Sequence, residues 1–124
     1  MSDPFMRAID HFNDEEYREA LLAFEERWHT ERSDFLRALI QLSNAMNQLR
    51  LGLVSGPQRN LTSAHALLAT YLPQHEGMDI AAIRAYIAQL LELIPENAAQ
   101  GDVVWSTVPR LCLSVGSQAS RGEL

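Results

Sequence analysis

The sequence predicts an all-α fold, a compact bundle of about five helices followed by an extended C-terminal segment. The stretch from Phe35 to Leu53 has the length of a helix and carries no charge between Ala38 and Leu49. On both sides of it, apolar residues recur at spacings of three and four, the period of amphipathic helices. The chain of 124 residues, 47% of them hydrophobic, has room for one globular domain.

The first two helices are predicted from their start signals. Asp3 followed by Pro4 marks a first helix that reaches Phe12, because proline is favoured at the first helical position. Asn13 lies three residues before Glu16, an arrangement similar to a capping box, so we expect the Asn13 side chain to cap a second helix. The apolar face of that helix consists of Tyr17, Ala20, Leu21, Phe24 and Trp28.

The neutral segment is predicted to be the third and central helix, capped by Ser33 or Asp34. Its apolar residues form a band too broad for a helix that lies on the surface. They are Phe35, Leu36, Leu39, Ile40, Leu42, Met46, Leu49 and Leu53. We therefore expect this helix to be mostly buried by its neighbours.

Two further helices follow, and short connections between successive helices favour antiparallel neighbours. A fourth helix is predicted over about residues 57–72, with a turn over residues 73–77. Asp79 is expected to cap a fifth helix, whose apolar spacing continues until Pro95.

The end of the chain differs in character. Residues 103–115 are rich in β-branched side chains, contain Pro109 and show no helical period, which predicts an extended segment laid across the bundle. We expect a helical bundle over 1–96 and an extended C-terminal segment with a flexible tail over 97–124. The single cysteine, Cys112, is expected to be a small packing residue.

Composition excludes several classes of function. The net charge of −6 disfavours nucleic acid as a partner, because the chain repels phosphates. The absence of lysine excludes Schiff-base and phosphate-loop lysines, and one cysteine permits no thiolate metal cluster. No apolar stretch approaches the ~20 residues that span a bilayer, and no signal-peptide pattern opens the chain. We expect a cytoplasmic protein without cofactor, metal or membrane partner.

A candidate polar pocket is predicted between the second and third helices. Its residues are Glu19, Glu25, Gln41, Asn44 and Arg50. Because an unsatisfied buried amide costs about 1–3 kcal/mol, the two amides either bond to neighbouring helices or line a small pocket. Glu25 has a structural alternative, since it could form a partly buried ion pair with an arginine of the third helix.

One metal-like motif occurs, at Glu26 and His29. A Glu-x-x-His sequence places both side chains on one helix face, but a carboxylate-bridged metal bundle needs two copies and further glutamates. We therefore expect Glu26 and His29 to lie on a solvated face.

Three blocks of residues between Phe12 and about Leu72 share a pattern with a known family. The positions that fit are Phe12, Asn13, Tyr17, Glu19, Ala20, Glu25 and Trp28, then Leu39, Ile40, Gln41 and Leu42, then Arg50 and Gly52. This half of the chain resembles the Domain of Unknown Function 309 family. The resemblance implies a compact bundle of about five helices and no established activity. Leu21 and Leu22 stand where members carry His-Glu, so an activity that rests on those groups is not expected here.

No complete catalytic constellation is present in the sequence. We expect a non-enzymatic helical interaction or scaffold module that acts through an apolar groove or through self-association, with a protein partner or a homodimer. If the C-terminal segment of one chain covered another, a symmetric dimer would follow. The alternative is a small-molecule-binding protein or an enzyme whose pocket lies between the second and third helices. A cavity lined by polar atoms without protein partners would favour that alternative.

Overall fold

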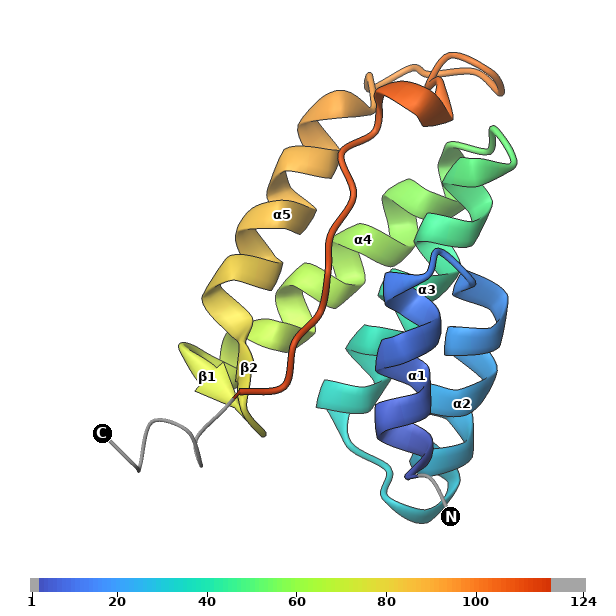
Figure 1. Ribbon diagram of the computed structural model, residues 1–124. Helices are drawn as coiled ribbons and strands as arrows, with labels where there is room; N and C mark the ends of the chain where they lie inside the picture. The colour runs from blue at the N-terminus through green and yellow to red at the C-terminus, as the bar shows by residue number, and fades with distance from the viewer. Residues whose placement is uncertain (1–2, 117–124) are drawn as a thin grey trace.

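Five α-helices follow one another along the chain in the computed structural model, which describes residues 3–116 (Figure 1). The helices are α1 (Pro4–Asn13), α2 (Tyr17–Thr30), α3 (Asp34–Arg50), α4 (Ser55–Leu68) and α5 (Ile80–Leu93). Shorter elements are the 3₁₀ helices η1 (Ala69–Tyr71) and η2 (Trp105–Thr107) and the two-residue strands β1 (Gln74–His75) and β2 (Met78–Asp79). The predicted all-α fold class is confirmed.

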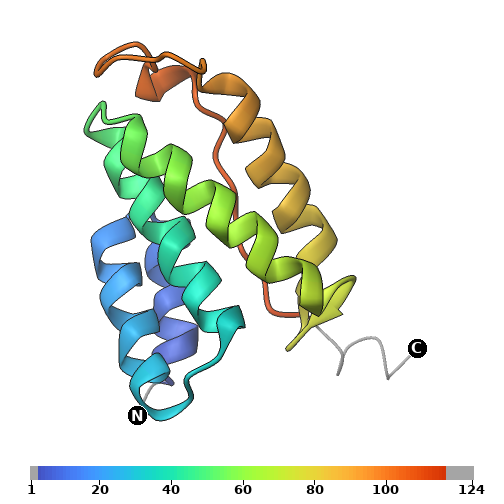
Figure 2. The same ribbon diagram turned by 180° about the vertical axis from the view of Figure 1, so that it is seen from behind.

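Helix α3 is the centre of the packing. It contacts α2 on one side and α4 on the other, while α1 packs on α2 and α5 packs on α4 (Figures 1 and 2). Nine of its residues are buried, including Ala38, Leu39 and Leu42, which have no exposed surface. The neutral segment is therefore buried, as its breadth of apolar residues predicts.

Three of the predicted helix starts are formed by side-chain caps. The side chains of Asp3, Ser33 and Asp79 accept hydrogen bonds from backbone N–H groups in the first turns of α1, α3 and α5, at 3.1, 3.2 and 2.9 Å. Each cap satisfies a donor that the helix itself leaves without a partner. Local sequence was sufficient to predict these boundaries.

The predicted cap at Asn13 is wrong. Helix α2 starts at Tyr17 without a side-chain cap, and Asn13 is instead the last residue of α1. The Asn13 amide pairs with the backbone of Leu113: Nδ2 donates to the carbonyl oxygen at 2.8 Å, and the Leu113 N–H donates to Oδ1 at 2.7 Å. A side-chain amide has the donor and acceptor of a peptide group, so it pairs with an extended segment as a neighbouring strand would.

The connection between α4 and α5 contains more structure than the predicted turn. Helix α4 starts two residues before Pro57, which its first turn accommodates, and ends at Leu68 rather than near residue 72. A small hairpin of β1 and β2 then leads into α5. Its turn residues Glu76 and Gly77 both have positive φ, 47° and 78°, the conformation that tight two-residue hairpins require.

The C-terminal segment crosses the bundle in an irregular, mostly extended conformation, as predicted. After η2 it runs between α5 and α1 (Figure 1). Val103, Val108 and Leu113 are buried, whereas Cys112 is exposed. The expectation that Cys112 packs inside is wrong, because neighbouring side chains of an extended chain point to opposite sides and Leu113 takes the inner position.

Hydrogen bonds and aromatic contacts hold this segment to its own chain. The Tyr86 hydroxyl donates to the carbonyl oxygen of Pro109 at 2.6 Å. Trp105 packs edge-on against Tyr17, with 5.8 Å between ring centroids, and the Arg110 guanidinium covers Trp105 at 3.7 Å. The division into units 1–96 and 97–124 stays a prediction, and the predicted flexible tail falls on residues 117–124, outside the described residues.

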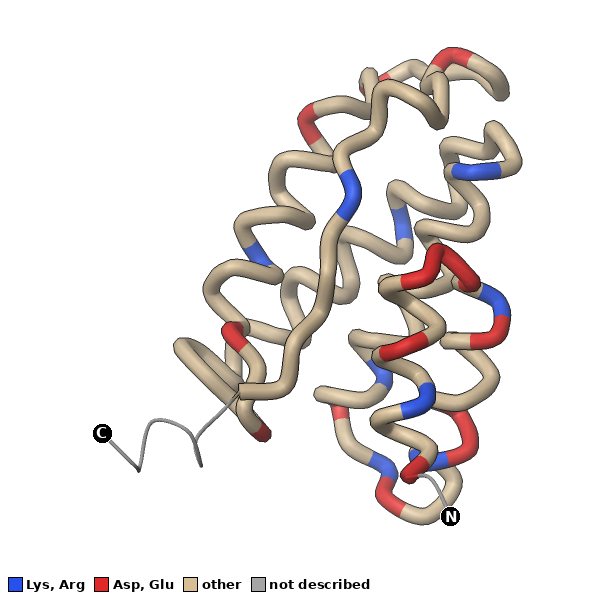
Figure 3. The backbone as a smooth tube through the Cα atoms, viewed as in Figure 1, with Lys and Arg blue, Asp and Glu red and all other residues tan. Residues whose placement is uncertain are grey.

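Acidic residues concentrate on α2 and on the connections at its two ends, whereas α4 carries none (Figure 3). Glu26 and His29 are exposed, as predicted, and Glu26 pairs with Arg7 at 3.0 Å. Within residues 3–116, no helix is long and apolar enough to cross a membrane.

Candidate functional site

An open pocket of about 320 Å³ lies between α2 and α3. Glu25 and Trp28 of α2 line one wall, and Arg37, Ile40 and Gln41 of α3 line the other. Residues three or four apart share one face of a helix, so each helix presents its residues to the pocket as a group. The volume is at the lower end of the roughly 300–1,000 Å³ of small-molecule sites.

The apolar part of the pocket is formed by Trp28 and Ile40, both partly buried against the core. The Arg32 guanidinium covers the Trp28 ring at 4.5 Å, a cation–π contact that restricts the indole. The pocket therefore has one ordered aromatic wall.

The amide of Gln41 has no hydrogen-bond partner for its Oε1, which is shielded from solvent. A buried acceptor without a donor costs about 1–3 kcal/mol. The terminal torsion of glutamine is broad, so the amide is able to turn its oxygen or its nitrogen towards the pocket. A polar atom without a protein partner beside a pocket favours a binding role for Gln41 over a structural one.

Glu25 and Arg37 line the same pocket without pairing. In the part of the chain that the structure describes, no ion pair joins Glu25 to an arginine of α3. The structural ion pair expected for Glu25 is therefore not formed. A carboxylate and a guanidinium instead remain available on opposite walls of one pocket.

The structure brings together two of the five residues proposed for the pocket, Glu25 and Gln41. Glu19 is exposed on another face of α2. It lies six residues before Glu25, about 1.7 helical turns away, so the two side chains point in different directions. Asn44, half-buried, is one turn beyond Gln41 and does not line the pocket. Arg50 lies at the far end of α3.

Arg50 is engaged by the connection between α1 and α2. Its Nη1 donates to the carbonyl oxygen of Glu15 at 2.6 Å and its Nη2 to Oδ1 of Asn47 at 2.8 Å, while the guanidinium lies 5.5 Å from the Tyr17 ring centroid. These contacts join the end of α3 to the α1–α2 connection, so the role of Arg50 is structural.

Sequence reasoning missed three lining residues, Trp28, Arg37 and Ile40, as members of the pocket. Their spacing in the sequence could have indicated two of them, because Trp28 is one turn after Glu25 and Arg37 is one turn before Gln41. Which two helix faces meet is decided by packing, and single-helix periodicity does not report it.

A second buried polar group lies beneath the C-terminal segment. Tyr17 is fully buried and its hydroxyl has no hydrogen-bond partner. Burial raises the pKa of Tyr17 to about 12, and the negative charge of Glu15 acts in the same direction. Burial likewise raises the pKa of Tyr86, whose hydroxyl does have a partner in Pro109. Both phenols are therefore neutral at physiological pH.

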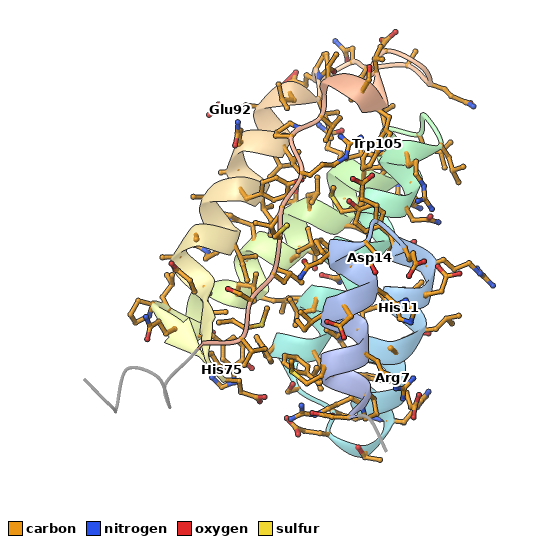
Figure 4. The ribbon with its side chains drawn as sticks, viewed as in Figure 1. Arg7, His11, Asp14, His75, Glu92 and Trp105 are labelled. Carbon is orange, nitrogen blue, oxygen red and sulfur yellow. The ribbon has the colours of Figure 1, made fainter. Side chains whose placement is uncertain are left out.

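Titratable side chains elsewhere are dispersed. Arg7 and His11 lie on α1, His75 in the hairpin and Glu92 on α5, at separate places on the molecule (Figure 4). His11 pairs locally with Glu16 at 2.7 Å. Over residues 3–116, no group of three His, Cys, Asp or Glu side chains is arranged to hold a metal ion.

Exposed apolar residues occur in two loops at one end of the molecule, the α3–α4 connection and the loop that precedes η2. The Gly101 N–H donates to the carbonyl oxygen of Gly52 at 2.9 Å and ties the two loops together. Beside this bond, Leu51 is 64% and Val104 55% exposed. We call Leu51, Leu53 and Val104 the apolar end.

Comparison with known proteins identifies a matching family model. Residues 5–60 match the family model described as Domain of unknown function (DUF309), which covers α1 to α3 and the start of α4, and therefore both walls of the pocket. No curated protein and no solved structure is significantly similar to the chain. The resemblance inferred from the sequence is therefore confirmed over residues 5–60, which are similar to the family described as Domain of unknown function (DUF309).

Proposed function

We propose that the protein is a non-enzymatic small-molecule-binding module, the alternative that the sequence leaves open, and that its binding site is the pocket between α2 and α3. The observation that supports this is the buried, unpaired Gln41 carbonyl oxygen beside a pocket that is also lined by the partly buried Glu25 carboxylate and the exposed Arg37 guanidinium, which form no ion pair with each other. A buried acceptor without a donor, such as Gln41 Oε1, is unfavourable in the free protein and becomes favourable when a ligand supplies the missing bond.

The composition of the pocket supports binding rather than catalysis. Its lining contains no serine, cysteine, histidine or lysine, so it offers no nucleophile beyond the Glu25 carboxylate. Glu25 also has no second carboxylate beside it in the pocket with which to divide acid and base roles. We propose a cytoplasmic location and a protein or small-molecule partner, and not nucleic acid, because the chain is acidic.

The two tryptophans provide the test. Trp28 lines the pocket, whereas Trp105 packs on Tyr17 beneath the C-terminal segment. When ¹⁵N-labelled protein is titrated with a library of small fragments, binding in the pocket shifts the Trp28 indole and Gln41 amide resonances and leaves the Trp105 indole unchanged. A Trp28→Phe variant assigns the indole signals. A library without any fragment that shifts Trp28 selectively contradicts the proposal.

The second candidate is self-association through the apolar end. Exposed apolar groups on ordered loops are typical of protein–protein contacts, and the Gly52–Gly101 hydrogen bond holds these loops in place. Sedimentation equilibrium should show a dimer that Leu51→Asp dissociates. Leu22→Asp is the matched control, because Leu22 is 50% exposed on α2, outside the apolar end. A monomeric wild type, or equal dissociation in both variants, rules this candidate out.

A further inference from the structure

The pocket between α2 and α3 holds two opposite charges on facing walls. Glu25 is on α2 and Arg37 on α3, and no ion pair joins them among the described residues. A ligand with a single charge would meet one group of opposite sign and one of like sign. A ligand that carries both charges satisfies both groups, so the pocket favours a zwitterion over a simple anion or cation.

The α3 wall has a second polar group beside its charge. Gln41 is one helical turn after Arg37 and lines the pocket, and its amide is not fixed by a hydrogen bond through Oε1. The unpaired atom of Gln41 is an acceptor, so once turned towards the pocket it suits the N–H donors of an ammonium group, while the Arg37 guanidinium suits a carboxylate. The α2 wall has only the Glu25 carboxylate as a charged acceptor, which suits an ammonium group.

The remaining lining residues define the uncharged part of the ligand. Trp28 and Ile40 offer an aromatic and an aliphatic surface, and the pocket has a volume of about 320 Å³. An apolar side chain of a few carbon atoms would bury its surface against them, at about 0.8 kcal/mol for each CH₂ group. A polar side chain would meet no remaining partner there.

Resting on the proposed function, we infer that the ligand class of this pocket is a free α-amino acid with an apolar side chain. Arg37 holds its carboxylate, Glu25 and the Gln41 carbonyl oxygen accept hydrogen bonds from its ammonium, and Trp28 and Ile40 contact its side chain. A peptide terminus does not meet these requirements, because each end of a peptide presents only one of the two charges.

The test uses L-leucine and two analogues on the full chain, measured by isothermal titration calorimetry. 4-Methylpentanoic acid lacks the ammonium group and 3-methylbutylamine lacks the carboxylate. L-Leucine is expected to bind with a stoichiometry of one, and each analogue at least about tenfold more weakly, because each loses one charge-assisted interaction. Equal affinity for leucine and either analogue overturns the inference while leaving the pocket as a binding site.

Variants locate the binding. Arg37→Gln and Glu25→Gln should each lower leucine affinity about tenfold or more. Arg59→Gln and Glu92→Gln, which change exposed residues outside the pocket, should leave the affinity unchanged. Leucine binding that none of the four variants alters would place the ligand elsewhere and overturn the inference.

A stability measurement on Gln41→Met is independent of any ligand. Methionine keeps the length of the side chain and removes the carbonyl oxygen without a partner. The variant should unfold at a higher urea concentration than the wild type and bind leucine more weakly, which is the signature of a polar group kept for a ligand. A lower unfolding midpoint would show that Gln41 is structural and overturn its role. If leucine fails to bind while fragments still shift Trp28, only the ligand class is wrong.

Discussion

At the scale of single residues, hydrogen-bond partners distinguish side chains that look alike in the sequence. Tyr17 and Tyr86 are both buried tyrosines, but the Tyr86 hydroxyl donates to Pro109 whereas the Tyr17 hydroxyl has no partner. Gln48 and Gln41 differ in the same way: Gln48 Oε1 accepts a hydrogen bond from Asn60 at 3.1 Å, and Gln41 Oε1 accepts none. Chemical type predicts that such groups need partners, and only the fold decides which of them find one.

The two tyrosines make a matched pair for mutation. Tyr86→Phe removes a hydrogen bond and leaves the Pro109 carbonyl unpaired, so it should lower the free energy of unfolding by about 1–2 kcal/mol. Tyr17→Phe removes a buried hydroxyl without a partner and should leave the free energy unchanged or raise it by about 1 kcal/mol. Urea denaturation at pH 7 measures both. A Tyr17→Phe loss as large as that of Tyr86→Phe would reveal an unseen partner for the Tyr17 hydroxyl, such as a bound water.

The raised pKa of Tyr17 also predicts a pH dependence. The pKa of the phenol is about 12 in the folded chain and 10.0 as its ordinary value, so the unfolded chain ionises first. Stability is therefore fully present below pH 10 and is lost as the pH rises from 10 towards 12. Urea titrations in that range should show a smaller loss for Tyr17→Phe than for the wild type. An identical loss in both proteins would show that Tyr17 does not contribute.

At the scale of elements, the C-terminal segment shows how an irregular stretch is fixed. It has no ladder of backbone hydrogen bonds to a neighbouring strand in the part of the chain that the structure describes. Its polar groups are satisfied at separate points, by Asn13 at Leu113 and by Tyr86 at Pro109. Burial of Val108 and Leu113 between these points adds apolar stabilisation. Side chains of the helices therefore replace a partner strand.

The Asn13 contact can be tested directly. Asn13→Ala removes both hydrogen bonds to Leu113, and we expect the unfolding free energy to fall by about 1–3 kcal/mol and the Leu113 amide to exchange with deuterium faster. Asn60→Ala is the control, because it removes a hydrogen bond between α4 and Gln48 of α3 that does not involve the C-terminal segment. Leu113 exchange that is equal in the two variants would mean that packing alone holds the segment.

At the scale of the whole molecule, the order of the helices places the candidate site. Because α3 is packed between α2 and α4, one of its faces contacts α2 and another contacts α4. The pocket between α2 and α3 is lined on the α3 side by Arg37, Ile40 and Gln41, which lie in the N-terminal half of that helix. Val103, Val108 and Leu113 of the C-terminal segment are buried by their own chain, so their burial does not require a second copy. The homodimer stays a prediction that now depends on the apolar end.

The sequence by itself determined the elements that depend on local patterns. A neutral run as long as Ala38 to Leu49 is too apolar to lie in water, and the caps at Ser33 and Asp79 act within one helical turn, so the buried central helix and these boundaries follow from neighbouring residues. Only the tertiary structure decided that Asn13 pairs with Leu113 and that Glu25 meets Arg37 and Gln41 without bonding to either. Those contacts join residues from different elements, and the packing of whole helix faces sets which side chains meet there.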